Sequence, residues 1–353
     1  MDDRGAAELR AAVPALAELI TARHYRVQPG LAERYGPEGR ARCIEDCQSH
    51  LSCLSEALAT DCPALFVDYV GWVKALIARY GVPADHLAVH LRCMQETLRE
   101  QLPADRAQRA AECVELGVAA LTQPAPSVPS FLDPEAPHAA LARDYLQALR
   151  ATDRHRARAL IVDAFHGGVP VNEIYLHVFQ PCQFEVGRLW HLGDVSVAEE
   201  HFCTAVTQSI MGHLYPSIFA SPRSQRTAVV CCVGNELHEL GARMVADFLE
   251  LAGWDTVYLG ANTPPQGIAV MVSERGADLV CLSVTLTRHL HLVVASIAAV
   301  RQRVAPRRVP ILVGGYPFRM APDLWQRIGA DGCARDADSC VELAGQMIDR
   351  ARA

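Results

Sequence analysis

Apolar residues recur at helical spacing through the first third of the chain. Spacings of three and four residues predict helices that bury one face. Proline and glycine interrupt this pattern, so the helices should break at Pro29, Gly36-Pro37 and Gly81-Val82-Pro83. We therefore predict an all-helical domain over residues 1–122. The positions that show the spacing best are Leu51, Leu54, Leu58, Phe66, Val70, Val73 and Ile77.

A proline-rich segment separates this domain from a second helical region. Residues 123–137 contain five prolines, which remove backbone donors and disfavour a helix, so we interpret them as a linker. Helical spacing resumes over residues 138–220, where stops at Gly167-Gly168 and Gly193-Asp194 leave room for four helices and predict a four-helix bundle. Ser196 and Glu199 form a capping-box pattern, so a helix should begin directly after Ser196.

The pattern changes from residue 226 onward, where short apolar runs alternate with helix-length segments. This alternation predicts a flavodoxin-like, doubly wound parallel sheet over residues 226–353, and the fold class is α plus α/β. In such sheets, ligands bind at the carboxyl ends of the strands. The apolar runs are TAVVCCV, DTVYLG, DLVCLSV and VPILVGG.

Composition narrows the possible partners. The 353 residues carry a formal net charge of −7, which provides no basic field for binding DNA. No run of 18 apolar residues is present, and Met1-Asp2-Asp3-Arg4 is too acidic for a targeting signal, so we expect a cytoplasmic protein without a membrane span. The 13 cysteines include no CxxC pair, and buried free thiols are expected rather than a structural zinc site.

A histidine follows the first predicted strand, in the sequence Gly-Asn-Glu-Leu-His-Glu-Leu-Gly that ends at Gly241. Neutral imidazole is a good ligand for cobalt, and a carboxylate two residues away can hold the ring through its other nitrogen. His238 and Glu236 have this relationship. On its own the pattern is also typical of an ordinary surface or helix-capping histidine.

The spacing of further residues resembles the signature of cobalamin-binding domains. Glu236-x-His238-x-x-Gly241 is followed after 41 residues by Ser283-Val284-Thr285, and after 28 more by Gly314-Gly315. The signature has aspartate where this chain has Glu236. The resemblance implies that His238 is the lower axial ligand of cobalt, that Ser283 and Thr285 meet the displaced nucleotide tail, and that the two glycines leave room for it.

A second group of candidate cofactor-binding residues lies in the predicted bundle. Trp190 and His191 are followed by a turn and then by Val197, Glu200 and His201, which share one helix face. An ordinary interpretation is a core tryptophan beside a solvated helix start. However, Trp, nine residues, then Glu-His resembles the cap of CarH-type cobalamin photoreceptors. That resemblance implies adenosylcobalamin, with Trp190, Val197, Glu200 and His201 around the adenosyl group, and His191 as an upper cobalt ligand after photolysis.

The layout of the whole chain resembles that of photocobilins, which pair cobalamin with biliverdin. A bilin needs aromatic walls and cations for its propionates. Ordinary helix packing explains the same residues of the first domain equally well. The bilin-binding candidates are Tyr35, Arg40, Arg42, His50, Tyr69 and Trp72, and Cys43, Cys47 and Cys53 are candidates for a thioether.

These resemblances predict a light-sensing signalling protein rather than an enzyme, with light-dependent self-association, an unknown downstream effector and no direct DNA binding. The main alternative is a corrinoid shuttle protein for methyl transfer. Two others are a mutase subunit, which would need a separate catalytic barrel, and a flavodoxin-like interaction module without a cofactor.

Overall fold

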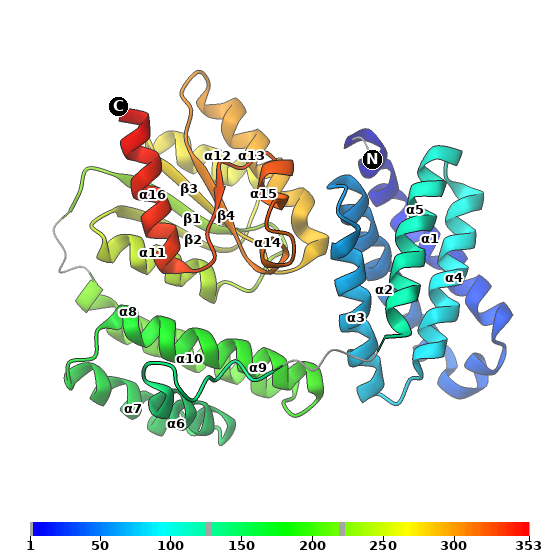
Figure 1. The fold of residues 1–353 in the computed structure, drawn as a ribbon, viewed down its shortest axis with the longest axis horizontal. Helices are drawn as coiled ribbons and strands as arrows, with labels where there is room; N and C mark the ends of the chain where they lie inside the picture. The colour runs from blue at the N-terminus through cyan, green and yellow to red at the C-terminus, as the bar shows by residue number, and fades with distance from the viewer. Residues whose placement is uncertain (1–2, 124–128, 219–222, 353) are drawn as a thin grey trace. The chain divides into compact units, whose positions relative to one another are not determined.

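The computed structural model describes residues 3–123, 129–218 and 223–352, and these form two compact units (Figure 1). Unit 1 contains residues 1–126 with the short segments 286–291 and 316–328, and unit 2 contains the rest. Part of the predicted linker, residues 124–128, and the end of the predicted bundle, residues 219–220, lie outside the described residues. None of the described helices is both long and apolar enough to cross a membrane.

Residues 3–121 of unit 1 are helical, as predicted. The helix breaks fall at the expected places: Pro29 precedes α2, Gly36 kinks α2 with a φ of 62°, and Gly81 follows α3 with a φ of 67°. The predicted apolar face is largely buried, including Leu51 and Phe66. The helices are α1 (Asp3–Val27), α2 (Gly30–Ala59), α3 (Pro63–Arg79), α4 (Ala84–Gln101) and α5 (Ala104–Leu121), joined in unit 1 by η2 (Thr287–His289), α14 (Tyr316–Met320) and α15 (Leu324–Arg327).

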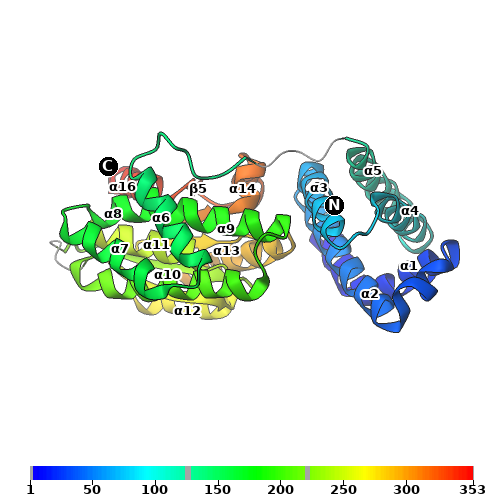
Figure 2. The same cartoon turned by 90° about the horizontal axis from the view of Figure 1, so that it is seen from below.

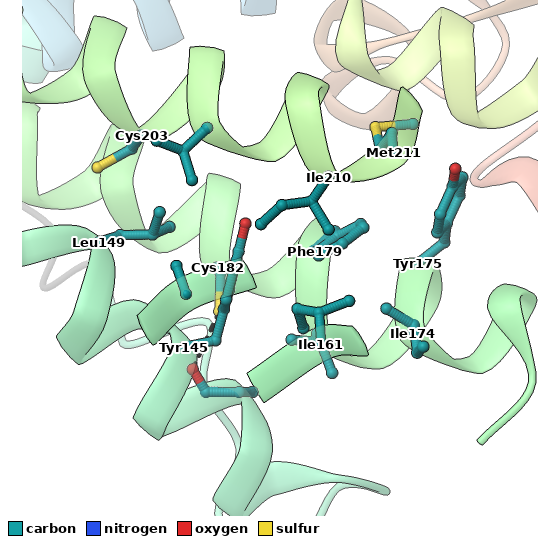
Figure 3. Close-up of a cluster of buried hydrophobic side chains, with 14 of the residues drawn as sticks. Tyr145, Leu149, Ile161, Ile174, Tyr175, Phe179, Cys182, Cys203, Ile210 and Met211 are labelled. Atoms are coloured by element: carbon teal, nitrogen blue, oxygen red, sulfur yellow. Dashed lines mark hydrogen bonds between the residues drawn. The ribbon is translucent and has the colours of Figure 1, made fainter. Parts of the chain in front are cut away.

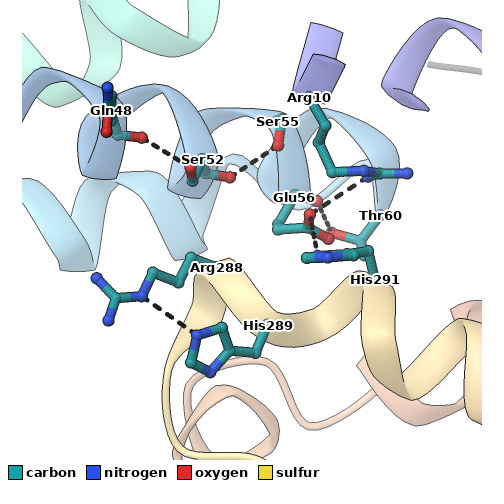
Figure 4. Close-up of polar contacts among 9 residues, drawn as sticks. All are labelled: Arg10, Gln48, Ser52, Ser55, Glu56, Thr60, Arg288, His289 and His291. Carbon is teal, nitrogen blue, oxygen red and sulfur yellow. Dashed lines mark hydrogen bonds and ion pairs between the residues drawn. The ribbon is translucent and has the colours of Figure 1, made fainter. Parts of the chain in front are cut away.

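A buried carboxylate in unit 1 contacts an arginine and a histidine from distant parts of the sequence (Figure 4). Glu56 is buried on α2, with Arg10 Nη1 at 3.3 Å and His291 Nδ1 at 3.0 Å from its Oε1 atom. A buried carboxylate without such partners would be costly. The Glu56 cluster therefore compensates its charge within this unit.

Residues 139–218 of unit 2 form the predicted four helical rods. The third rod is continuous but contains one π-helical turn, and tyrosine, phenylalanine and aliphatic side chains fill the centre of the bundle (Figure 3). Tyr145, Tyr175 and Phe179 are fully buried there. The elements are α6 (Ala139–Arg150), α7 (Arg154–His166), the third rod of α8 (Val171–Ile174), η1 (Tyr175–Phe179) and α9 (Gln180–Leu192), and α10 (Val197–Ile218).

The rest of unit 2 is a parallel five-stranded sheet in the order β2-β1-β3-β4-β5, which is the predicted doubly wound fold. Four strands match the four apolar runs, while the two-residue β5 was not predicted. The helices α11 and α16 pack on one face of the sheet. The elements are β1 (Thr227–Val233), α11 (Leu240–Leu251), β2 (Asp255–Thr263), α12 (Pro265–Glu274), β3 (Leu279–Ser283), α13 (Leu290–Val304), β4 (Ile311–Gly314), β5 (Gly332–Cys333) and α16 (Ala337–Arg352).

The helical bundle and the sheet share a core. Met244 and Phe248 of α11 belong to the same buried cluster as the bundle side chains, and Trp190 packs against that cluster. Helix α11 therefore lies between the bundle and the sheet (Figure 1). In Figure 2, which is seen from below, the bundle helices lie in front of the sheet domain. The bundle thereby packs directly on the domain that carries His238.

Candidate functional site

His238 lies on the loop between β1 and α11, at the point where the strand order reverses. The chain leaves β1 at Val233 and enters α11 at Leu240, and β1 has β2 on one side and β3 on the other. Ligands of doubly wound sheets bind at this kind of switch point. The loop is held by Asn262, whose Oδ1 accepts a hydrogen bond from Asn235 N at 2.7 Å. The His238 side chain is 56% exposed, so its ring is accessible to a ligand.

Glu236 fixes the orientation of that ring. It is fully buried, and its Oε1 lies 2.5 Å from His238 Nδ1. Its Oε2 accepts a hydrogen bond from the backbone N–H of Thr285 at 2.8 Å, so one carboxylate ties together the loops after β1 and β3. A proton on Nδ1 leaves Nε2 as the nitrogen that ligates a metal. Glu236, which stands where the signature has aspartate, therefore reaches the His238 ring.

Ser283, Thr285 and the two glycines lie along the same edge of the sheet. Cys232 pairs with Ser283 in the register of β1 and β3, and Ser283 pairs with Gly314 in that of β3 and β4. A Cβ on Gly315, which has a φ of 115°, would lie 1.8 Å from the carbonyl oxygen of Val284. The structure therefore gives a different physical reason for Gly315 than room for a ligand, namely the close approach of two backbones. At Gly241, by contrast, an added Cβ would meet open space.

The predicted cap residues lie where α9 ends and α10 begins. Gly193 ends α9 in a left-handed conformation, with a φ of 91°. Both hydrogen bonds of the predicted capping box are present, from Ser196 N to Glu199 Oε2 at 2.7 Å and from Glu199 N to Ser196 Oγ at 3.2 Å. Helix α10 therefore begins where the sequence predicts.

The face formed by Val197, Glu200 and His201 is directed away from the bundle core. Val197 is 52% exposed, and the His201 side chain is 74% exposed with its Nδ1 at 2.6 Å from Glu200 Oε2. Trp190 is half-buried against the core and His191 is buried at the end of α9. An exposed apolar residue beside a carboxylate–imidazole pair is a surface on which a ligand with apolar and polar groups can pack.

Two contacts that the sequence did not reveal join the bundle to the His238 loop and to helix α11. Gln208 Nε2 on α10 donates to Glu239 Oε1 at 2.6 Å, directly after His238. The buried Tyr175 hydroxyl, on the π-helical turn, donates to Asp247 Oδ2 on α11 at 2.9 Å. Asp247 lies 72 residues from Tyr175 in the sequence, so no local pattern marks the pair. The π-helical turn that carries Tyr175 is a structural indication of a functional site, because such turns are frequent at functional sites.

The residues predicted to bind a bilin fall into separate groups within unit 1. His50 Nδ1 lies 2.8 Å from the Tyr69 hydroxyl, and the rings of Tyr69 and Trp72 stack with centroids 6.3 Å apart. Burial lowers the pKa of His50 to about 4, so this ring is neutral near pH 7. The Tyr35 hydroxyl is buried and has no hydrogen-bond partner within the described part of the chain.

The predicted cations and thiols of the bilin site are less suitably placed for binding a bilin than His50, Tyr69 and Trp72. Arg42 is exposed and forms an ion pair with Glu45, and Arg40 lies 3.8 Å from Glu18. Cys53 is buried, which raises its thiol pKa to about 12, and burial also raises the pKa of Cys47. Buried thiols of this kind react slowly because the thiolate is the nucleophile. These contacts do not favour a thioether at either cysteine.

Taken with its surroundings, the His238 loop can hold a metal ion through its imidazole. One accessible imidazole is oriented by a buried carboxylate, open space surrounds Gly241, and backbone strand ends lie beside it. Neutral imidazole suits cobalt, and small residues allow a bulky ligand to approach.

Comparison with known proteins finds family matches for both parts of unit 2. Residues 226–344 match a family described as B12 binding domain, and residues 141–215 match a second family with the same description. Both matches indicate a cobalamin or corrinoid cofactor. The Methanosarcina barkeri monomethylamine corrinoid protein has the same fold over 60% of this chain and 100% of its own, with a TM-score of 0.54 at 17% identity.

Relatives of two functional kinds are similar to this chain. The HTH-type transcriptional repressor CarH of Myxococcus xanthus is 28% identical over 54% of this chain, and the match spans 63% of the repressor's own length. A corrinoid protein of Desulfitobacterium hafniense is 25% identical over 47% of this chain and 77% of its own length. Dimethylamine corrinoid protein 2 of Methanosarcina acetivorans is 27% identical over 46% of this chain and 76% of its own length.

Proposed function

Because residues 141–215 and 226–344 match B12 binding domain families, we propose that this chain is a light-sensing signalling protein that holds adenosylcobalamin through His238. The observation that carries the choice of a sensor is the Val197, Glu200 and His201 face, which stands outside the bundle core. This face has the residues of the photoreceptor cap, and the similarity to the CarH repressor supports the same choice.

In this proposal, residues of the sheet hold the cofactor from below. His238 would hold the cobalt through Nε2, while Glu236 holds the ring through Nδ1. Ser283, Thr285 and Gly314 line the edge of the sheet where the nucleotide tail enters. Since Glu236 also binds the backbone of Thr285, the ligand and the tail site are positioned by one buried group.

Residues of the bundle cover the upper face. Trp190 and Val197 provide apolar surface for the adenosyl group, and Glu200 and His201 provide polar contacts. When bound, adenosylcobalamin supplies a cobalt–carbon bond that visible light breaks. His191 is buried, so it has to leave its site in α9 before it can act as an upper ligand. We propose that Gly193 permits this shift, because glycine tolerates large backbone changes.

The output of the sensor is proposed to be a change in self-association, read by a separate effector. The first 121 residues are helices of a chain with a net charge of −7, and this charge does not favour DNA as the partner. A second chromophore, biliverdin, is proposed for unit 1. The stacked Tyr69 and Trp72 rings and the neutral His50 support it.

The corrinoid shuttle remains the second candidate function, because corrinoid proteins from three species share the fold or sequence of unit 2. A shuttle has to present its cobalt to a methyltransferase partner, whereas a sensor keeps an adenosyl group under a cap. The two functions therefore differ in their response to light.

The decisive experiment uses the chain loaded with adenosylcobalamin in the dark. We expect visible light to change its absorption spectrum and its mass in light scattering. His238→Ala should lose the bound cofactor, while His213→Ala, an exposed histidine of α10 paired with Arg158, should behave as the unmodified chain. A loaded protein that is inert to light and unchanged in mass contradicts the sensor and favours the shuttle. A colourless protein contradicts both.

A further inference from the structure

The helices of unit 1 bring two histidines and a cysteine together in the interior. His24 lies on α1, Cys43 on α2 and His90 on α4. The two Nδ1 atoms are 3.2 Å apart, and Cys43 Sγ lies 3.9 Å from each of them. Both histidines are buried and Cys43 is half-buried, so this cluster is not a set of solvated side chains.

These separations match those of ligands around one metal ion. Zinc binds histidine nitrogen at about 2.0–2.1 Å and cysteine sulfur at about 2.3 Å, and tetrahedral angles then place N and N about 3.4 Å apart and N and S about 3.6 Å apart. The observed separations are 3.2 Å and 3.9 Å. Movements of a few tenths of an ångström, on the order of ordinary side-chain adjustment, bring all three atoms into a first coordination sphere.

A hydrogen bond beside the cluster orients His24 as a ligand. His24 Nε2 lies 2.8 Å from Gln28 Oε1, and an N–H donated there leaves the Nδ1 lone pair directed at the cluster. Burial lowers the pKa of His24 and lowers that of His90 further, so both rings are neutral, which is the form that binds metals.

Without an ion, His90 has no satisfactory tautomer. Its Nε2 is buried and has no hydrogen-bond partner in the described residues. If the proton is on Nδ1, Nε2 is a buried acceptor that lacks a donor. If the proton is on Nε2, two Nδ1 lone pairs face each other at 3.2 Å. A cation bound to both Nδ1 atoms removes that repulsion, and it fixes the His90 proton on Nε2.

We propose that His24, Cys43 and His90 form a binding site for one divalent transition-metal ion, with Zn²⁺ as the best match. Imidazole and thiolate are the ligands that zinc prefers, and three protein ligands leave a fourth position for water or a small ligand. On binding, a metal–sulfur bond forms and the thiol proton passes to solvent, with no change of oxidation state. Burial raises the pKa of the free Cys43 thiol to about 11, so that proton is present before the ion binds.

The site is separate from the cobalamin site, and it changes the expectation for Cys43. A thiolate bound to a metal is not available to form a thioether with a bilin. Metal occupancy and covalent chromophore attachment at Cys43 therefore exclude each other.

The test uses the full chain, stripped with a chelator, kept reduced and titrated with Zn²⁺ alone. We expect one tightly bound zinc per chain by elemental analysis after gel filtration. Cys43→Ser and His90→Gln should each weaken zinc binding by at least about 100-fold, measured by competition with a chromophoric chelator. Cys113→Ser, at a buried cysteine of α5 outside the cluster, should leave the affinity unchanged.

Equal zinc retention by Cys43→Ser and the unmodified chain overturns the proposal, as does the absence of tight binding. Because a buried substitution can prevent folding, a second measurement uses the unmodified chain. Zinc should slow alkylation of Cys43, mapped by mass spectrometry, without slowing that of Cys113. An unchanged rate at Cys43 overturns the site. Neither result bears on His238, so the cobalamin proposal stands or falls separately.

Discussion

At the scale of single residues, the most informative group beside the proposed cobalt ligand is Glu236. Its two oxygens hold both the His238 ring and the Thr285 backbone. Glu236→Gln keeps the shape but weakens the contact to Nδ1, and we expect cobalamin affinity to fall about 10- to 100-fold, the usual range for groups that orient a metal ligand. Absorption titrations with cobalamin measure this. Glu274→Gln, an exposed glutamate at the end of α12, is the matched control, and equal affinities for both variants would refute the positioning role.

A second single-residue prediction concerns pH. Burial raises the pKa of Asp247 to about 6, although its hydrogen bond from Tyr175 acts in the opposite direction. Between its usual pKa near 3.9 and about 6, the folded chain binds a proton that the unfolded chain does not. The free energy of unfolding therefore falls as pH rises through this window, and the contribution of this group is about 3 kcal/mol.

Asp247→Asn removes this titration and keeps an acceptor for the Tyr175 hydroxyl. Between pH 4 and pH 7, roughly the window that the raised pKa defines, the unmodified chain should lose up to about 3 kcal/mol more stability than the variant. Urea unfolding followed by circular dichroism measures both. Asp255→Asn, at an exposed position that begins β2, controls for the loss of a carboxylate. Identical pH dependence in the unmodified chain and Asp247→Asn would rule out the buried titration.

Individual contacts were predictable only where the partners are close in sequence. Glu236 and His238 are two residues apart, and Ser196 and Glu199 are three, so a pattern could indicate both pairs. Tyr175 and Asp247 are 72 residues apart, and His24 and His90 are 66 apart. Only tertiary packing brings such residues together, and no local spacing marks them.

At the scale of elements, two glycines at the predicted site have opposite structural roles. Ala at position 315 would overlap the Val284 carbonyl in a backbone conformation with a φ of 115°, so Gly315→Ala should destabilise the sheet by about 3 kcal/mol or more. Gly241 lies in the first turn of α11 with open space around it. Gly241→Ala should therefore leave stability unchanged or raise it by up to about 1 kcal/mol.

The two glycine variants distinguish an effect on stability from an effect on cobalamin binding. Gly241→Ala places a methyl group where we propose that the cofactor approaches, so it should reduce cobalamin affinity in a chain that remains fully folded. Thermal unfolding and cobalamin titration of the same samples provide both quantities. A Gly241→Ala chain that binds cobalamin as tightly as the unmodified one would mean that the cofactor does not approach α11 at this position.

Element types were predicted well because burial leaves a clear pattern. TAVVCCV is buried along its length, as expected for a central parallel strand, and it forms β1 without error. The proline and glycine breaks of α1 to α4 were also predicted correctly. The strand β5 was missed because it has only two residues, too few for any hydrophobic period to be visible.

At the scale of the whole molecule, the proposal requires the bundle to move relative to the sheet domain. Helix α11 contributes side chains to the cores on both of its sides, and Gln208 and Tyr175 make hydrogen bonds to Glu239 and Asp247. A shift of α9 and α10 therefore acts on the His238 loop through α11. Contacts of this kind have discrete arrangements rather than a continuous range, which is what a switch requires.

The histidines at the two ends of the α9–α10 turn allow this switch to be tested. We predict that His191→Ala binds adenosylcobalamin in the dark and responds to light, but that its illuminated form lacks an upper histidine ligand and releases cobalamin faster. His191 is buried in the structure, so we expect that dark binding does not depend on it, whereas His201 is exposed beside Glu200. His201→Ala should weaken dark binding and yet give an illuminated spectrum like that of the unmodified chain. Absorption spectra recorded before and after illumination measure both forms. If His191→Ala and the unmodified chain give the same illuminated spectrum, His191 does not reach the cobalt and the bundle need not move.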